Sequence, residues 1–312
     1  MILCLNANAA IDKTVVVSPF RLNAIHRPRQ VLAAPGGKGA NVARGLQRLG
    51  ETAVVAGWVG GFSGQFIEAG LRREGIATAL VQVDGESRTC LSILDPEQNT
   101  LTEIYERGEP IAPAQVDQLK ALLQSTVAQY AAVTLSGSLP PGVPSSFYGE
   151  LLEIARAAGV PGFLDSGGEA LRRGLEIGRP RLIKPNAHEF AELVGRKLDR
   201  PAEIAQAAVE LSTRHQTIVA VSLGADGILA ADRSEVVRLR PPRLAIQSAV
   251  GSGDCTLAGI VYGLTRGLSL EQALRYGVAA GTANALTVGA GYFELGDFER
   301  VLAQVAPVDV VS

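Results

Sequence analysis

Residues 248–259 read Ser248-Ala249-Val250-Gly251-Ser252-Gly253-Asp254-Cys255-Thr256-Leu257-Ala258-Gly259, and apolar residues at helical spacing follow at Ile260, Val261 and Leu264. Two glycines allow backbone N–H groups to converge on one point, and the start of a helix adds a positive partial charge there. Asp254 could accept the proton of a hydroxyl while these N–H groups hold a phosphoryl group. An Asp at a helix start is also an ordinary cap, so this stretch alone leaves both interpretations open.

Outward from this stretch, short β-rich runs alternate with helical patterns through most of the chain. The alternation predicts an α/β fold, in which a mostly parallel sheet carries helices on both faces. Sheets of this kind bind ligands at the carboxyl ends of their strands, which is where the glycine-rich segments fall. We expect strands at Ile2–Asn6, Ala53–Val59, Ala131–Ser136, Gly162–Asp165, Arg181–Lys184 and Thr217–Ser222, and helices at Gly39–Leu49, Gln115–Ala128, Phe147–Ala158, Ala202–Arg214 and Glu271–Leu286.

Two pairs of β-rich runs have no helix between their members and predict a small β-lid, formed by about residues 12–35 and 87–108. A small isolated sheet exposes its edges, so we expect a homodimer in which lid pairs with lid. Repeats and linker-like segments are missing, and residues 1–312 are therefore expected to form a single domain with this lid. The four runs are Lys13–Val17, Arg29–Ala34, Thr89–Leu94 and Thr100–Glu106.

The composition limits the class of protein. The apolar fraction is 47% over 312 residues, enough to fill a core, and the net charge is −2. This balance provides no general attraction to nucleic acid or to an anionic membrane. Apolar runs are too short to span a membrane, and three widely spaced cysteines fit buried thiols in a reducing cytosol. We therefore expect a cytoplasmic protein without nucleic-acid or membrane partners.

A second glycine-rich loop precedes another predicted helix: Pro35-Gly36-Gly37-Lys38-Gly39-Ala40-Asn41-Val42. Its glycines allow close approach of the backbone, and Lys38 and Asn41 add a cation and an amide suited to a phosphorylated, polyhydroxylated ligand. The spacing is not that of a P-loop, which occurs nowhere in the chain. A glycine-rich turn with a solvated lysine remains the alternative.

Two charged residues of the lid region, Asp12 and Arg88, could bind parts of a phosphorylated sugar. Asp12 follows the first strand, where a carboxylate could bind sugar hydroxyls, although it could equally be a turn residue. Arg88 precedes a lid strand, and its planar guanidinium suits a phosphate, although most such arginines are solvated. The loop Ser136-Gly137-Ser138-Leu139-Pro140-Pro141-Gly142 is expected to face the same crevice.

Together with the loop of residues 136–142, two further segments suit the donor nucleotide. In Ile183-Lys184-Pro185-Asn186-Ala187-His188-Glu189, Asn186 and Glu189 lie three residues apart, which suits Mg²⁺ held through water. Glu189 could instead be a favourable acidic residue of a first helical turn. Ser222-Leu223-Gly224-Ala225-Asp226-Gly227 indicates either a simple hairpin or a platform for nucleotide phosphate and ribose.

Other enzyme classes lack their signatures. The histidines His26, His188 and His215 are scattered, and neither GxSxG nor HExxH occurs, which weakens hydrolase and zinc-enzyme interpretations. The first strand is not followed by the GxGxxG of dinucleotide-binding oxidoreductases.

Taken together, these motifs resemble the PfkB (ribokinase-like) carbohydrate kinases from Asn6 to about Gly291. Two motifs in this order are specific to that family: Gly36-Gly37-Lys38-Gly39 with Asn41, and Gly251-x-Gly253-Asp254. The chain looks most like the branch of 1-phosphofructokinases, tagatose-6-phosphate kinases and minor 6-phosphofructokinases, because it also carries Ser136–Pro140, Asp165–Leu171 and Lys184-Pro185-Asn186.

The resemblance implies a role for each matched residue. Asp254 would be the general base, the amides of Gly251, Ser252 and Gly253 an anion hole, and Asn186 with Glu189 the magnesium-associated pair. The substrate would be bound by Asp12, Gly37, Lys38, Asn41, Arg88, Ser138 and, as a weaker addition, Arg27. The ATP site would be lined by Lys184, Asn186, Glu189, Ser222, Gly224 and Gly227, with Asn284 near the adenine.

Some positions depart from the family pattern. Ala249 stands where Thr is frequent, and Cys255 follows the base where Ser is common, but neither change removes a catalytic group. Ser252 and the run Arg88-Thr89-Cys90 after Glu86 are more similar to tagatose-6-phosphate kinases, whereas Asp165–Leu171 is similar to the minor 6-phosphofructokinases.

The expected function is ATP-dependent phosphorylation of fructose 1-phosphate or tagatose 6-phosphate to a ketohexose bisphosphate. The alternatives are a minor 6-phosphofructokinase, a kinase for an unphosphorylated sugar or nucleoside, and a non-catalytic sugar-phosphate sensor.

Overall fold

A computed structural model describes residues 1–309. Within them, one large sheet has the strand order β14-β13-β12-β11-β10-β9-β8-β1-β4-β5. Neighbouring strands are parallel from β5 to β11, and the last three join antiparallel at one edge, so the mostly parallel sheet predicted from the sequence is confirmed. The strands are β1 (Ile2–Asn6), β4 (Ala53–Gly60), β5 (Ala77–Val83), β8 (Ala132–Ser136), β9 (Gly162–Asp165), β10 (Leu182–Ile183), β11 (Ile218–Ser222), β12 (Ile228–Asp232), β13 (Glu235–Arg240) and β14 (Ala306–Pro307).

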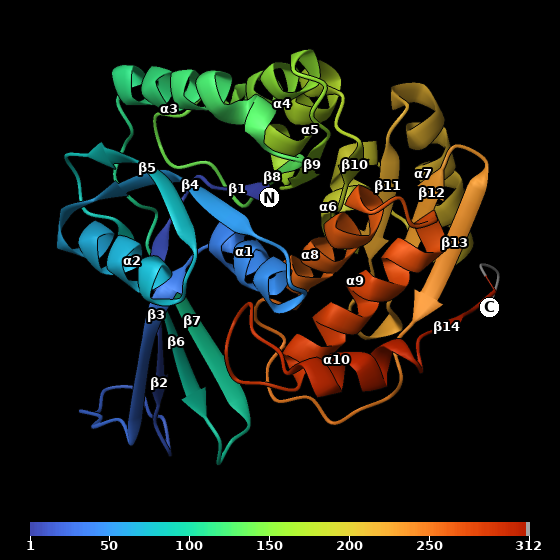
Figure 1. Cartoon of the computed structure of the whole chain (residues 1–312). Coiled ribbons are helices and arrows are strands. Elements are labelled where there is room, and N and C mark those ends of the chain that lie inside the picture. Colours follow the sequence, from blue (N-terminus) through green and yellow to red (C-terminus); the bar gives the residue numbers. More distant parts are fainter. Residues whose placement is uncertain (310–312) are drawn as a thin grey trace.

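Helices cover both faces of this sheet, as predicted (Figure 1). Successive side chains of a strand point to opposite faces, so a strand between two helical layers is apolar throughout. In β1, Ile2 and Cys4 join one buried cluster, and Leu3 and Leu5 join the other. The first cluster includes side chains of α1 (Lys38–Arg48), α2 (Gly61–Arg73), α8 (Ser252–Thr265), α9 (Leu270–Ala285) and α10 (Leu295–Leu302), and the second includes those of α3 (Pro113–Thr126), α4 (Phe147–Ala157), α5 (Gly168–Gly178), α6 (Ala187–Val194) and α7 (Pro201–His215).

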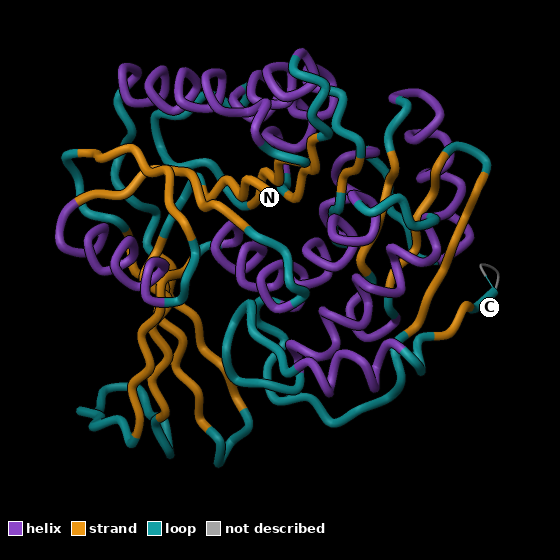
Figure 2. Tube along the Cα trace, in the orientation of Figure 1, coloured by secondary structure: helices purple, strands orange, loops and turns teal. Residues whose placement is uncertain are grey.

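A separate four-stranded sheet forms the lid, in the order β3-β2-β6-β7. Its two central strands run parallel, and each outer strand is antiparallel to its neighbour. Figures 1 and 2 show this sheet extending away from the main body. The predicted lid runs coincide with these strands apart from their ends, where hydrogen bonding decides the last residues. The bounds are β2 (Ala10–Val16), β3 (Gln30–Gly36), β6 (Arg88–Asp95) and β7 (Thr100–Tyr105).

The polar residues of interest gather at the carboxyl ends of the parallel strands. Asn6 ends β1, Ser136 ends β8, Asp165 ends β9 and Ser222 ends β11, while Lys184 directly follows β10. Helices α1 and α8 pack against one another and begin at this end. The lid joins the body here too, through the short connection from β1 to β2. No helix within residues 1–309 combines the length and the apolar character needed to cross a bilayer.

Candidate active site

A cavity of about 960 Å³ lies between the lid, the first turn of α1 and the loop that precedes α8. Its size suits a sugar phosphate together with part of a nucleotide. The structure thus brings together segments that are far apart in the sequence. The residues predicted to act in the site that line this cavity are Asp12, Gly37, Lys38, Asn41, Arg88, Ser138, Glu189, Gly251, Gly253 and Asp254.

Asp254 lies in the first turn of α8 and is 6% exposed. The N-cap is Gly251, and Asp254 Oδ2 accepts a 2.8 Å hydrogen bond from Asn41 Nδ2 across the cavity, so Asp254 does not cap the helix. Arg44 Nη1 donates to Asn41 Oδ1 at 3.0 Å, which orients the amide. Burial raises the pKa of Asp254 to about 6, although the Lys38 ammonium acts in the opposite direction. A carboxylate with this pKa suits a general base near neutral pH.

The loop before α8 can hold an anion. Gly251 has φ +79, a backbone conformation that favours glycine, and it lets the chain turn directly into the helix. The 14-residue α8 then directs its first N–H groups and its positive end toward the cavity. A Cβ built on Gly253 would lie 3.6 Å from Lys184 Nζ, so a cation stands beside this loop. The hydroxyl of Ser252 is turned away, toward Asn284.

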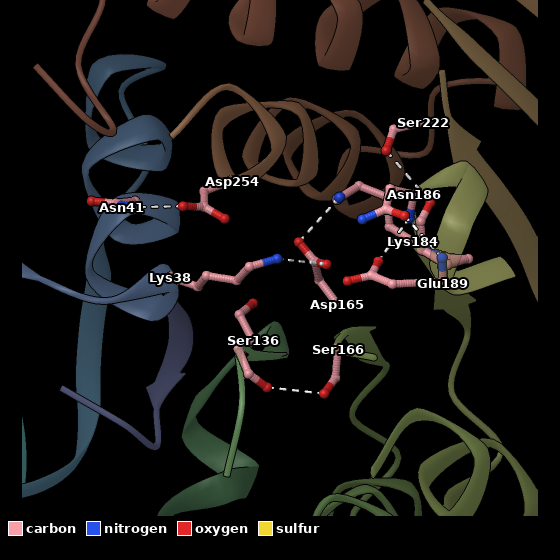
Figure 3. A network of polar contacts seen from close by, with 12 residues as sticks. Lys38, Asn41, Ser136, Asp165, Ser166, Lys184, Asn186, Glu189, Ser222 and Asp254 are labelled. Atoms are coloured by element: carbon pink, nitrogen blue, oxygen red, sulfur yellow. Dashed lines mark hydrogen bonds and ion pairs between the residues drawn. The ribbon is translucent and has the colours of Figure 1, made fainter. Parts of the chain in front are cut away.

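Asp165 joins two lysines at the floor of the site. Lys38 Nζ lies 3.2 Å from Asp165 Oδ1, and Lys184 Nζ lies 3.1 Å from Asp165 Oδ2. Burial by itself would raise the pKa of Asp165, but Lys184 and Lys38 outweigh it and hold that pKa below its usual value. The Asp165 carboxylate in turn raises the pKa of Lys38. Figure 3 shows Lys38 extending between Asp254 and Asp165, so a net positive charge faces the base.

Asn186 and Glu189 form a reciprocal pair at the start of α6. Glu189 N donates to Asn186 Oδ1 at 2.9 Å, and Asn186 N donates to Glu189 Oε2 at 2.8 Å. The alternative interpretation of Glu189 as a first-turn acid is therefore correct as a structural role. Glu189 Oε1 has no hydrogen-bond partner among residues 1–309, and this carboxylate lines the cavity. Among the same described residues, no three His, Cys, Asp or Glu side chains are grouped so that they could hold a metal ion. The chemistry of the single Glu189 carboxylate at the cavity fits a Mg²⁺ held largely through water and phosphate.

The lid contributes two charged residues to the cavity, Arg88 and Asp12. Arg88 donates from Nε and Nη2 to Asn8 O, both at 3.3 Å, and from Nη1 to Glu106 O at 3.0 Å. A guanidinium has five N–H donors, so Arg88 is held in place with donors to spare. Burial raises the pKa of Asp12, with Arg44 opposing it. Ser138 Oγ accepts a 3.3 Å hydrogen bond from the side-chain Nδ2 of Asn8, the residue whose carbonyl binds Arg88.

Several residues predicted for the site lie outside the cavity wall. Arg27 is exposed in the loop between β2 and β3, at the far end of the lid. Ser222 forms a β-bridge with Asn186, and Gly224 and Gly227 belong to the turn from β11 into β12. Ser222 therefore adjoins Asn186, but Ser222, Gly224 and Gly227 do not line the cavity.

The predicted position of Asn284 beside the adenine is wrong. Asn284 is 0% exposed on α9, behind the loop that precedes α8. Its Nδ2 donates to Val250 O and to Ser252 Oγ, and its Oδ1 accepts from Tyr292 N. A side chain that is fully buried and bonded in this way cannot contact a nucleotide base.

Sequence patterns gave no separate role to some residues at the site. Asp165 was singled out only as part of a family run, and Ser136 only as part of a loop, although Ser136 Oγ is buried without a hydrogen-bond partner among residues 1–309. The signal that both share is a polar residue at the last position of a buried strand. Glu103 and Tyr105 on β7 also line the cavity and bond to one another. Exposed strand residues such as these carry no local signal.

Comparisons with known proteins match almost the whole chain. Residues 6–295 match the model of the pfkB family of carbohydrate kinases. The chain is 31% identical to tagatose-6-phosphate kinase of Staphylococcus epidermidis RP62A, over 99% of this chain and 100% of that protein. The structure of phosphofructokinase-2 from Escherichia coli in complex with potassium has a TM-score of 0.90 at 30% identity. The match covers 97% of this chain and 98% of that one. A possible 1-phosphofructokinase from Thermotoga maritima has a TM-score of 0.89 at 28% identity, over 99% of this chain and 100% of that one. The chain therefore belongs to the pfkB family of carbohydrate kinases.

Proposed function

We propose that this protein transfers the γ-phosphoryl group of ATP to the free primary hydroxyl of a phosphorylated ketohexose and so produces a ketohexose bisphosphate. The observation that carries the proposal is Asp254: a buried carboxylate with a pKa near 6, at the start of α8, bonded to Asn41 inside the cavity. Lys38, Lys184 and Arg88 provide positive charge around the same site.

Asp254 acts as the general base in this proposal. The sugar hydroxyl lies within hydrogen-bond reach of its carboxylate and gives up its proton to it as the oxygen attacks the γ-phosphorus. The new P–O bond forms in line with the breaking bond to the ADP oxygen. N–H groups of Gly251 to Gly253 stabilise the charge on the transferred group, and Lys184 beside Gly253 adds to this.

The donor nucleotide occupies the side of the cavity where Asn186 and Glu189 lie. Lys184, Ser222, Gly224 and Gly227 lie at the ends of the adjacent strands, where ATP phosphates and ribose would rest. Glu189, with Asn186 beside it, would hold Mg²⁺ through water. The ion, when bound, would neutralise charge on the phosphates.

The acceptor sugar occupies the lid side. Asp12 and Asn41 face it with a carboxylate and an amide suited to hydroxyls, and Arg88 faces it with unused guanidinium donors suited to its phosphate. Lys38 contributes positive charge at the base of this pocket, although in the free protein its ammonium is paired with Asp165. Closure of the lid would exclude water and limit hydrolysis of ATP.

The identity of the sugar is tested by ADP release with fructose 1-phosphate, tagatose 6-phosphate and fructose 6-phosphate, measured side by side with an unphosphorylated ketohexose and a nucleoside. The relatives include a tagatose-6-phosphate kinase, a phosphofructokinase-2 and a possible 1-phosphofructokinase. We expect fructose 1-phosphate or tagatose 6-phosphate to give the highest kcat/KM. A preference for unphosphorylated sugars or nucleosides would contradict the proposal. Tight binding without ADP release would instead identify a sensor.

We also propose that two copies pair through their lids. Every residue of β7 is exposed, and the lid sheet exposes Val31, Leu32, Leu101 and Ile104. A sheet with open edges and exposed apolar side chains is stabilised by a second copy. The phosphofructokinase-2 of Escherichia coli has a tetrameric inhibited form. Ile104→Glu should shift the mass measured by light scattering toward the monomer, whereas an unchanged mass would count against the lid as the interface.

The cytoplasm is the compartment that we propose for the protein. Cys4, Cys90 and Cys255 are all unpaired and buried, as expected for thiols in a reducing environment.

A further inference from the structure

Asn284 uses its whole hydrogen-bonding capacity inside the protein. Its Nδ2 donates to Val250 O at 2.8 Å and to Ser252 Oγ at 3.3 Å. Its Oδ1 accepts from Tyr292 N at 3.2 Å and from Cys255 Sγ at 3.4 Å. A carboxamide has two N–H donors and an oxygen with two lone pairs, so all four positions are occupied. Nothing is left for a ligand.

These partners fix the amide in one orientation. The carbonyl of Val250 can only accept a hydrogen bond, and the backbone N–H of Tyr292 can only donate one, so Nδ2 must face the first and Oδ1 the second. The partners belong to three separate segments: the anion loop of residues 249–253, the first turns of α8, and the loop of residues 287–292. One side chain therefore sets the spacing of all three.

The loop of residues 287–292 also packs against Asn41 of α1, the residue that bonds to the Asp254 carboxylate. A Cβ built on Gly251 would lie 2.6 Å from Gly291 N, and a Cβ built on Gly291 would lie 2.7 Å from Asn41 Cα. This loop is therefore wedged between the anion loop and Asn41, which bonds to Asp254. Packing this close transmits a displacement from one segment to the next.

We infer that Asn284 is a positioning residue for phosphoryl transfer, which holds the anion loop so that the N–H groups of Gly251 to Gly253 point at the transferred group. It touches neither substrate and acts only through the loop. The inference rests on the proposed kinase function, because it concerns the geometry of that reaction.

The test uses Asn284→Asp and Asn284→Ala. Asn284→Asp keeps the size of the side chain but places an oxygen against the Val250 carbonyl, and Asn284→Ala removes all four bonds without adding charge. For folded variants we expect kcat to fall about 10²-fold, since a small misplacement of reacting groups costs this much, while KM for ATP and for the sugar phosphate stays close to wild type. Hydrogen–deuterium exchange should become faster in the peptide of residues 248–256.

The matched control is Ser212→Ala, which removes a buried hydroxyl that accepts a 2.7 Å hydrogen bond from Arg233 N, far from the cavity. It should lower thermal stability and leave kcat and exchange of residues 248–256 unchanged. A folded Asn284→Ala protein with normal kcat would overturn the inference. So would a raised KM for ATP with normal kcat, which would indicate a contact with the nucleotide. If the wild-type protein turned over none of the three sugar phosphates, the proposed function would fail, and unchanged exchange of residues 248–256 would separately overturn the role of Asn284.

Discussion

Asn41 and Asp254 lie 213 residues apart in the sequence and share a 2.8 Å hydrogen bond in the wall of the cavity. The bond joins the first turns of two helices that begin at the same end of the sheet, α1 and α8. One helix presents groups suited to the acceptor sugar, and the other presents the base and the anion loop. Their contact places the hydroxyl to be phosphorylated against the group that removes its proton.

Replacing Asn41 should change the pKa of the base. The hydrogen bond from Asn41 lowers the pKa of Asp254 and so favours the charged form. Asn41→Leu should therefore move the acidic limb of the pH profile of kcat/KM to higher pH and also lower its plateau. Profiles measured from pH 5 to pH 9 on both proteins provide the comparison. An unshifted limb would mean that Asp254 does not control it.

The wild-type pH profile should follow the protonation of Asp254. With a pKa of about 6, the carboxylate is largely ionised above pH 7 and increasingly protonated below pH 6. Because a protonated carboxyl cannot accept the hydroxyl proton, kcat/KM should fall tenfold per pH unit on the acid side. A profile that stays flat down to pH 5 would contradict this assignment.

Asp254 should also reduce the stability of the folded protein at neutral pH. Its pKa is raised from 3.8 to about 6 in the folded state, so the folded state binds the proton more tightly than the unfolded chain. The resulting stabilisation is present below pH 4 and is lost as the pH rises through 6. Asp254→Asn should therefore increase the free energy of unfolding at pH 8 by up to about 3 kcal/mol, and by much less at pH 4. Urea unfolding at both values measures the difference.

The buried pair of Asp165 and Lys184 should be strongly coupled. Their side chains are 1% and 3% exposed, so removing one partner leaves a charge in the interior. Lys184→Met should cost about 3 kcal/mol of unfolding free energy, moderated by the remaining contact of Asp165 with Lys38. The double variant with Asp165→Asn should lose less than the sum of the two single variants. Additive losses in urea unfolding would show that the pair is not coupled.

Arg88 should act on the phosphate that the substrate already carries. Arg88→Ala should raise KM for the sugar phosphate by about tenfold or more and leave KM for ATP nearly unchanged, since charge-assisted hydrogen bonds to phosphate are among the stronger polar contacts. Arg73→Ala, on α2 away from the cavity, is the matched loss of an arginine. Steady-state kinetics with each substrate varied in turn would separate the two effects. Equal increases in both KM values would place Arg88 elsewhere.

The parts of the site that the sequence predicted are those with a local signature. Glycines followed by a helix mark the two loops that carry Lys38, Asn41 and Asp254, and the structure brings these residues together. Asp165 also precedes two glycines and a helix, but its role could not be predicted from them, because its partner Lys38 is 127 residues away and the contact exists only once the sheet has aligned the strand ends. Asn284 was misplaced for the same reason: a helical position tells nothing of the loops that pack against it.

The base assignment of Asp254 is the central claim, and turnover by Asp254→Asn tests it most directly. ADP release would be measured with the preferred sugar phosphate, and binding of that sugar phosphate by calorimetry, on wild type, Asp254→Asn and Asp117→Asn, an exposed control on α3. We predict that Asp254→Asn lowers kcat by about 10³-fold or more while the sugar phosphate still binds, and that the control behaves as wild type. Turnover by Asp254→Asn close to the wild-type rate would contradict the assignment.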